Sequence, residues 1–215
     1  MVSLAVLVQP LAVNWPMLTS LNSIIMAMVM MLFLTRYSIL RVHKTWLYGL
    51  GSSAIVFEVI WLFSIAKLPG LARHLTVPHL LIWAIFIGFF LVRKVRSLMM
   101  EPYVTTCVLM GACTGYLLIG YLGGFLLHSL MILQPGSMDP AYLPAGLDPL
   151  ATPLKVFPSM VCASFEALTT VSNAVSRPGH LVSHVGCFAI AIVGQLYVAM
   201  LIGLILGRFQ QRLRR

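Results

Sequence analysis

The chain has 215 residues, of which 60% are hydrophobic and only 9% charged, whereas about a quarter of a soluble domain is charged. Several windows exceed the roughly 20 apolar residues that a helix needs to cross a bilayer. These values exclude a soluble globular domain and indicate an all-α polytopic membrane protein. The net charge of +9 does not indicate a nucleic-acid partner, because Lys and Arg gather in the cytoplasmic loops of membrane proteins.

The apolar stretches of the sequence predict five crossings and one re-entrant helix. Residues 1–14 are apolar but short, so we expect an interfacial or re-entrant piece there. Pro16 suits the first turn of the first span, where its missing N–H has no helical partner. The stretch 158–169, after a loop rich in Pro and Gly, is also too short to cross. The expected spans cover residues 17–35, 45–66, 77–92, 102–133 and 181–207.

The distribution of basic residues predicts the orientation of these spans. Ten of the fourteen Lys and Arg residues fall in the loops 36–44 and 93–101 and in the C-terminal segment. The positive-inside bias therefore places these segments in the cytoplasm, and the N-terminus and the 134–180 loop outside. The first residues lack a basic n-region and a small-residue cleavage site, so we expect no cleavable signal peptide. We expect a bacterial plasma membrane, with a thylakoid membrane as the alternative.

Two segments of the C-terminal half carry a resemblance to a known family. Residues 164–178 read SFEALTTVSNAVSRP, and residues 192–207 read IVGQLYVAMLIGLILG. Together they resemble the pore module of two-transmembrane, potassium-channel-like ion channels. In small bacterial and cyanobacterial members the pore segment reads like SFVTLTTLGYGDIVP and the inner helix like IGQLYLAVLVARLVG. The pore segment aligns without a gap from the paired threonines to the closing proline, and residues 1–100 match only in being apolar helices.

The resemblance implies a division of the chain and an oligomeric state. Residues 101–215 would form the pore module, with an outer helix, a re-entrant pore helix at about 158–169, a filter-like segment at 170–178 and an inner helix. Residues 1–100 would supply about three preceding spans. Those spans include no helix with Arg at every third position, so we expect no ordinary voltage sensor. Because each chain would build one quarter of a pore, the resemblance also implies a homotetramer.

The filter-like segment departs from the potassium-channel pattern at its glycines. A potassium filter coordinates the ion with rings of backbone carbonyls from four TVGYG loops. Forcing a residue with a Cβ into a left-handed conformation costs about 1–2 kcal/mol. We therefore expect this segment to follow a different backbone path. The predicted filter and pore residues are the retained Thr169, Thr170 and Val171 and the replacements Ser172, Asn173 and Ala174.

Five further positions near the predicted filter or on the predicted inner helix are candidates for a role in the pore. Val175 takes the place of the usual acidic residue, and Arg177 lies two residues further on, so the pore mouth would be positive and would favour anions. The alternative is that Arg177 pairs with a backbone carbonyl or a lipid headgroup. Glu166 could brace the filter or attract cations, and a hydrogen bond to filter backbone is the plainer interpretation. Gly194 and Gln195 lie where inner helices of this superfamily bend, which makes them gating-hinge candidates.

An acidic residue in the second span is a separate candidate. Glu58 lies in the middle of this span, where an ionisable side chain is costly and indicates function by default. It could pair with a basic residue of another helix or bind a partner. A hydrogen bond to Ser or Thr across a helix interface is the plainer interpretation.

Histidine, cysteine and glycine patterns complete the sequence reading. His180 and His184 have metal-ligand spacing and could sense pH, but no third ligand is near, so we expect no metal. The four cysteines lack metal or disulfide spacing and are expected to be buried free thiols. Small residues allow close helix approach in lipid. The glycines to which this applies are Gly111, Gly115, Gly120, Gly124, Gly203 and Gly207.

The sequence therefore predicts a weakly selective cation channel with an altered filter, passing monovalent cations across the lipid bilayer. The alternative is a non-conducting homologue that serves as a structural or regulatory subunit of a larger membrane complex. No nucleophile has a base near it in a recognisable motif, so we do not expect an enzyme. We expect no cofactor and no nucleic-acid partner.

Overall fold

A computed structural model describes residues 16–37, 44–101, 105–139, 153–172 and 180–213 of the chain. The described residues form six helices and no strand, which confirms the all-α class. The expected N-terminal piece at 1–14 and the positions Asn173, Ala174, Val175 and Arg177 lie outside them. The helices are α2 (Pro16–Tyr37), α3 (Lys44–Lys67), α4 (Pro69–Met100), α5 (Thr106–Leu133), α6 (Pro153–Leu168) and α7 (Leu181–Leu213).

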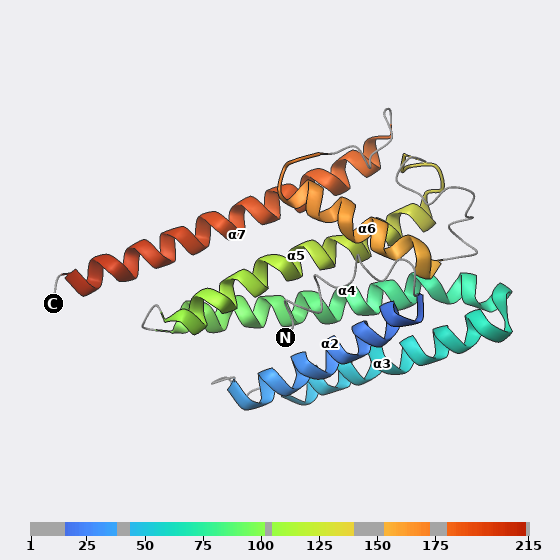
Figure 1. Cartoon of the computed structure of the whole chain (residues 1–215), viewed down its shortest axis with the longest axis horizontal. Coiled ribbons are helices and arrows are strands. Elements are labelled where there is room, and N and C mark those ends of the chain that lie inside the picture. The colour runs from blue at the N-terminus through green and yellow to red at the C-terminus, as the bar shows by residue number, and fades with distance from the viewer. Residues whose placement is uncertain (1–15, 38–43, 102–104, 140–152, 173–179, 214–215) are drawn as a thin grey trace.

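The helices are arranged around α5 and α6 (Figure 1). In the N-terminal part, α2 packs on α3, α3 on α4, and α4 on α5. In the C-terminal part, α6 packs on both α5 and α7, and it also contacts α2. Helix α7 is the most peripheral element, and its C-terminal half extends away from α6 (Figure 1). Aromatic rings fill the junction between the two parts, where Phe125 lies 4.6 Å from Phe157 and 5.9 Å from Trp83, centroid to centroid.

Four of the described helices are long and apolar enough to cross a membrane, which indicates a membrane-embedded protein. They are the helices at residues 48–67, 70–100, 106–133 and 181–208. In α2 the apolar run Met17–Leu32 is shorter, so the fifth crossing stays a prediction. Only 17% of the most apolar window of α7 is buried, against 61% for α5. Helix α7 therefore offers most of its surface to lipid or to another protein chain.

The third helix is much longer than the span predicted at 77–92. Helix α4 begins at Pro69, directly after Leu68, so the expected loop between the second and third spans is reduced to one residue. The indole N–H of Trp61 donates to the hydroxyl of Thr76 at 3.0 Å, and this bond ties the early turns of α4 to α3. Tertiary packing thus extends the helix beyond its most apolar part.

The short helix begins earlier than expected, at Pro153 instead of residue 158. Pro158, the first residue of the predicted stretch, lies inside the helix. Its 16 residues rise about 24 Å, less than the roughly 30 Å of a bilayer core. Helix α6 is therefore too short to cross, as the sequence predicted. Helix α7 continues past the predicted end at residue 207 to Leu213.

Two expectations about small residues need correction. All four cysteines are free, as expected, but only Cys187 is buried. A Cβ at Gly203 or Gly207 would meet nothing within 4 Å, so these two do not mark a close contact in this chain. The other three thiols are exposed and belong to α5 and α6. They are Cys107, Cys113 and Cys162.

Candidate functional site

Helix α6 is held tightly against α5, on the side where the sequence places glycines. The hydroxyl of Ser164 donates to the carbonyl of Gly120 at 2.7 Å. A Cβ at Gly120 would collide with the ring of Phe165, and one at Gly124 would lie 3.0 Å from the Cα of Val161. The close approach predicted for these α5 glycines is confirmed. These contacts fix the position of α6 along the axis of α5.

Helix α7 packs against the other end of the same unit. The phenol of Tyr197 donates to the carbonyl of Ala112 on α5 at 2.8 Å, and its ring fills the space left by Gly115. Gly194 is buried against Leu168, the last residue of α6. The hinge candidate Gly194 is thus a contact point for the short helix, and α7 runs through it as a continuous helix. Gln195 is exposed.

The end of α6 folds back on itself in a capped turn. The N–H of Val171 donates to the carbonyl of Glu166 at 3.0 Å, and the N–H of Thr170 donates to that of Ala167 at 3.1 Å. This is the Schellman pattern, whose left-handed position is usually glycine. Here that position is Thr170, with φ of 58°. Among the described residues, Thr170 is the only non-glycine residue with a positive φ.

The backbone at this turn shows the path of the first residues of the filter-like segment, Thr170 to Ser172. Ser172 does not take a positive φ, and its N–H also points to the carbonyl of Glu166, at 3.5 Å. The left-handed conformation is therefore at Thr170, two residues before Ser172. A β-branched residue with positive φ is uncommon and strained. Such strain persists only where the surroundings hold the backbone in place.

The predicted pore residues divide by exposure. Thr169, Thr170 and Val171 are exposed, and Val171 has 77% of its surface accessible. Ser172 and Glu166 are half-buried. The tip of the short helix thus presents hydroxyl groups at the surface of the single chain. The phenol of Tyr116 on α5 supports this tip from behind, by donating to the carbonyl of Leu168 at 3.3 Å.

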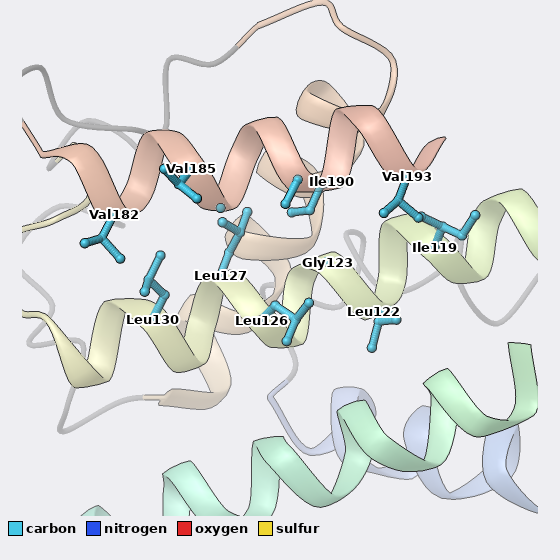
Figure 2. Close-up of a pocket in the computed structure, with 12 residues that line it drawn as sticks. Ile119, Leu122, Gly123, Leu126, Leu127, Leu130, Val182, Val185, Ile190 and Val193 are labelled. Carbon is cyan, nitrogen blue, oxygen red and sulfur yellow. The ribbon is translucent and has the colours of Figure 1, made fainter. Parts of the chain in front are cut away.

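A groove of about 380 Å³ lies between α5 and α7 (Figure 2). Figure 2 shows aliphatic side chains of both helices around it, among them Leu126 and Leu130 of α5 and Val185 and Val193 of α7. No residue that lines it is polar or charged. The groove can therefore accept an acyl chain or another apolar helix, and it cannot conduct or coordinate an ion.

The acidic residue Glu58 does not take the Ser or Thr partner that seemed plainest. Its carboxylate Oε2 lies 2.6 Å from Nε2 of His79 on α4, and the indole N–H of Trp83 donates to the same oxygen at 2.9 Å. The other alternative, a basic residue of another helix, is the one found. The sequence analysis did not identify His79 and Trp83 as partners of Glu58, because single polar groups in a long apolar run show no periodic pattern.

The two histidines at the start of α7 do not form a metal site. His180 is exposed and His184 half-buried. Within the described ranges, no group of three His, Cys, Asp or Glu side chains could hold a metal ion.

No protein-family model, no curated protein and no solved structure matches the chain. The pore module therefore stays a prediction from the residues quoted above.

Proposed function

We propose that the chain is one subunit of a membrane ion channel in which α5, α6 and α7 form the pore module. In this proposal the tips of several α6 helices surround the ion path, and the pore is weakly selective for monovalent cations. The observation that carries it is the short helix, which is wedged between two helices of spanning length and presents Thr169 and Thr170 at the surface.

The chemistry of the α6 tip supports cations over anions. The C-terminal end of a helix carries a partial negative charge from its aligned peptide dipoles. Hydroxyl oxygens of Thr169 and Thr170 are neutral ligands that suit a partly hydrated cation. Because Ser172 and Ala174 replace the filter glycines, we propose that the pore lacks rings of fixed carbonyls and does not separate potassium from sodium strongly. We therefore propose weak selectivity.

A second candidate function is a non-conducting subunit that keeps the same scaffold. It is favoured by the turn at Val171 and Ser172, whose N–H groups cap the end of α6 instead of continuing into an extended strand. In that case the exposed surface of α7 would serve as a contact for other membrane proteins.

Ion flux from liposomes separates the two candidates. The purified chain is reconstituted, and potassium, sodium and chloride gradients are tested side by side. A channel gives potassium and sodium flux of similar size, and flux is lost in Asn173→Arg. The control is Gln134→Arg, which adds the same charge at an exposed site after α5 and should leave flux unchanged. Absence of flux from a tetrameric protein would favour the non-conducting subunit.

A further inference from the structure

One side of the short helix α6 is exposed and polar. The apolar residues of α6 are buried, apart from Leu154 and Phe165, which are half-buried. The other exposed or half-buried residues recur every three or four positions, so they lie on one face of the helix. They form what we call the polar stripe, which consists of Lys155, Ser159, Cys162, Glu166 and, directly after the helix, Thr169. A helix with this pattern has its outer face in water.

The polar stripe reaches the middle of a membrane-spanning helix. The ring of Phe165 fills the space beside Gly120 on α5. By helix rise, Gly120 lies about 21 Å after the start of α5 and about 20 Å before its end. Helix α5 is long and apolar enough to cross a bilayer. Glu166, the neighbour of Phe165 in the chain, therefore lies near the centre of the bilayer.

A second polar side chain is exposed at the same depth, on α7. Within residues 181–207, Gln195 is the only exposed polar side chain, and the other exposed residues are apolar, as contact with lipid requires. Gly194 lies against Leu168, the last residue of α6. Gln195 is therefore level with the end of the polar stripe. Two neighbouring helices thus expose polar groups at one place.

Contact with lipid would be costly for these groups. A carboxylate at the bilayer centre costs about 2.5–3.5 kcal/mol on insertion scales, and such residues usually face protein or a water-filled cavity. Thr169 adds little to this cost, because its hydroxyl already donates to the carbonyl of Phe165 at 2.7 Å. Glu166 and Gln195 are therefore the residues that exclude lipid from this surface.

A dry contact with a second copy of the chain is also unfavourable. Copies that share one orientation in the membrane place equivalent residues at the same depth. Glu166 would then meet Glu166 of the other copy, and like charges repel at short distance. The one basic residue of the stripe, Lys155, lies about 16 Å away from Glu166 along α6, so it cannot be the partner. Water between the copies avoids this repulsion.

We propose that the polar stripe lines a water-filled cavity, which opens on the side of the membrane at which α6 begins and ends at Glu166 and Gln195. The charge of Lys155 does not cancel the attraction of Glu166 for cations, because about 16 Å exceeds the screening length of roughly 8 Å in physiological salt. A further step rests on the proposed channel function. In that step, hydrated monovalent cations reach the hydroxyl groups of the α6 tip through this cavity.

Thiol labelling in lipid vesicles tests the cavity without any assay of flux. Variants that retain one cysteine each are treated on both sides of the membrane with charged methanethiosulfonate reagents, and modification is followed by mass spectrometry. We expect Cys162 to react about tenfold faster or more than Cys113, because only a thiolate in contact with water reacts. Cys113 is the matched control, since it is also exposed but follows the exposed apolar residues Leu109 and Met110 on α5.

The same labelling applies to α7. Gln195→Cys should react like Cys162, and Phe188→Cys, at an exposed apolar position of the same helix, should react like Cys113. The proposal is overturned if Cys162 is as unreactive as Cys113. It is also overturned if oxidation joins Cys162 of two copies while the charged reagents fail to reach it, because a second copy would then cover the stripe.

The sign of the reagent tests the attraction for cations. Glu166 lies one helical turn after Cys162. The positive reagent should therefore modify Cys162 faster than the negative one, by up to about tenfold for a unit charge at this distance in water. The difference should vanish in Glu166→Gln and persist in the control Glu101→Gln, at the far end of α4. Equal rates for both reagents in the unchanged stripe would contradict a cation-attracting cavity.

Flux measurements form a separate arm. If cations pass along the stripe, modification of Cys162 by the positive reagent should abolish most of the flux, and the same treatment of the Cys113 variant should leave it unchanged. Full flux after complete modification of Cys162 would overturn the proposed route. A protein that shows the labelling pattern but no flux would refute the channel function and leave the cavity standing.

Discussion

Gly124 on α5 lies against the backbone of Val161 on α6, so closely that a Cβ at position 124 would be 2.7 Å from Cγ2 and 3.0 Å from Cα of Val161. Because one contact is with main chain, a larger residue cannot be accommodated by a rotamer change alone. The position of the short helix depends on this contact.

We expect Gly124→Ala to destabilise the protein by about 1–3 kcal/mol, the usual effect of overpacking. The measurement is thermal unfolding in detergent. The control is Gly88→Ala on α4, where a Cβ meets nothing within 4 Å. In that variant the better helix propensity of Ala should raise stability slightly. Equal effects of the two substitutions would contradict the packing described for α5 and α6.

Removing the carboxyl group of Glu58 should destabilise the N-terminal helices. Glu58→Ala leaves the N–H of Trp83 and Nε2 of His79 without their partner, which costs about 1–3 kcal/mol for each group. Glu58→Gln should cost less, because its amide oxygen can still accept from Trp83. The measurement is the midpoint of thermal unfolding, and the contradicting result is a Glu58→Ala variant as stable as Glu58→Gln.

At the strained turn that ends α6, we expect a substitution that raises the free energy of unfolding. Thr170→Gly should raise stability by up to about 1 kcal/mol, because it removes left-handed strain of about 1–2 kcal/mol while giving the unfolded chain more freedom. Thr169→Gly should lower stability, since Thr169 has no positive φ and its hydroxyl donates to the carbonyl of Phe165 at 2.7 Å. Destabilisation by both variants to the same extent would show that the turn is not strained.

The contact between α7 and α5 can be tested at a single hydroxyl. Tyr197→Phe removes the bond to the carbonyl of Ala112 but keeps the ring over Gly115, so we expect a loss of about 0.5–1.5 kcal/mol. Tyr48→Phe, at an exposed position of α3, is the matched control and should have no effect on unfolding. A larger loss in the control than in Tyr197→Phe would argue against the packing of α7.

The sequence predicts the helices well because each is an apolar run bounded by polar residues or prolines. It fails at the start of α4, where the Trp61–Thr76 bond extends the helix into a segment that looked like a loop. Such a tertiary contact joins residues 15 positions apart on two helices, and no local pattern reveals it. The early start of α6 was missed for a related reason, since Pro158 is buried inside the helix and does not begin it.

Around the candidate site, the sequence predicts which residues are present but not how the backbone runs. The glycines of α5 indicated close packing, and three of them receive side chains of α6 or α7: Gly115, Gly120 and Gly124. The left-handed turn at Thr170 could not be foreseen, because the glycine that usually marks such a turn is absent. His79 and Trp83 were also missed as partners of Glu58, since only the packing of α4 on α3 brings them to it.

The most direct test of the central claim is the reversal potential of the purified chain in a planar bilayer, with potassium on one side and sodium on the other. The account predicts a current whose reversal potential lies near zero under these conditions, and which moves to the cation equilibrium potential when one salt is diluted. A potential that follows chloride on dilution, or a tetramer that passes no current, would contradict it.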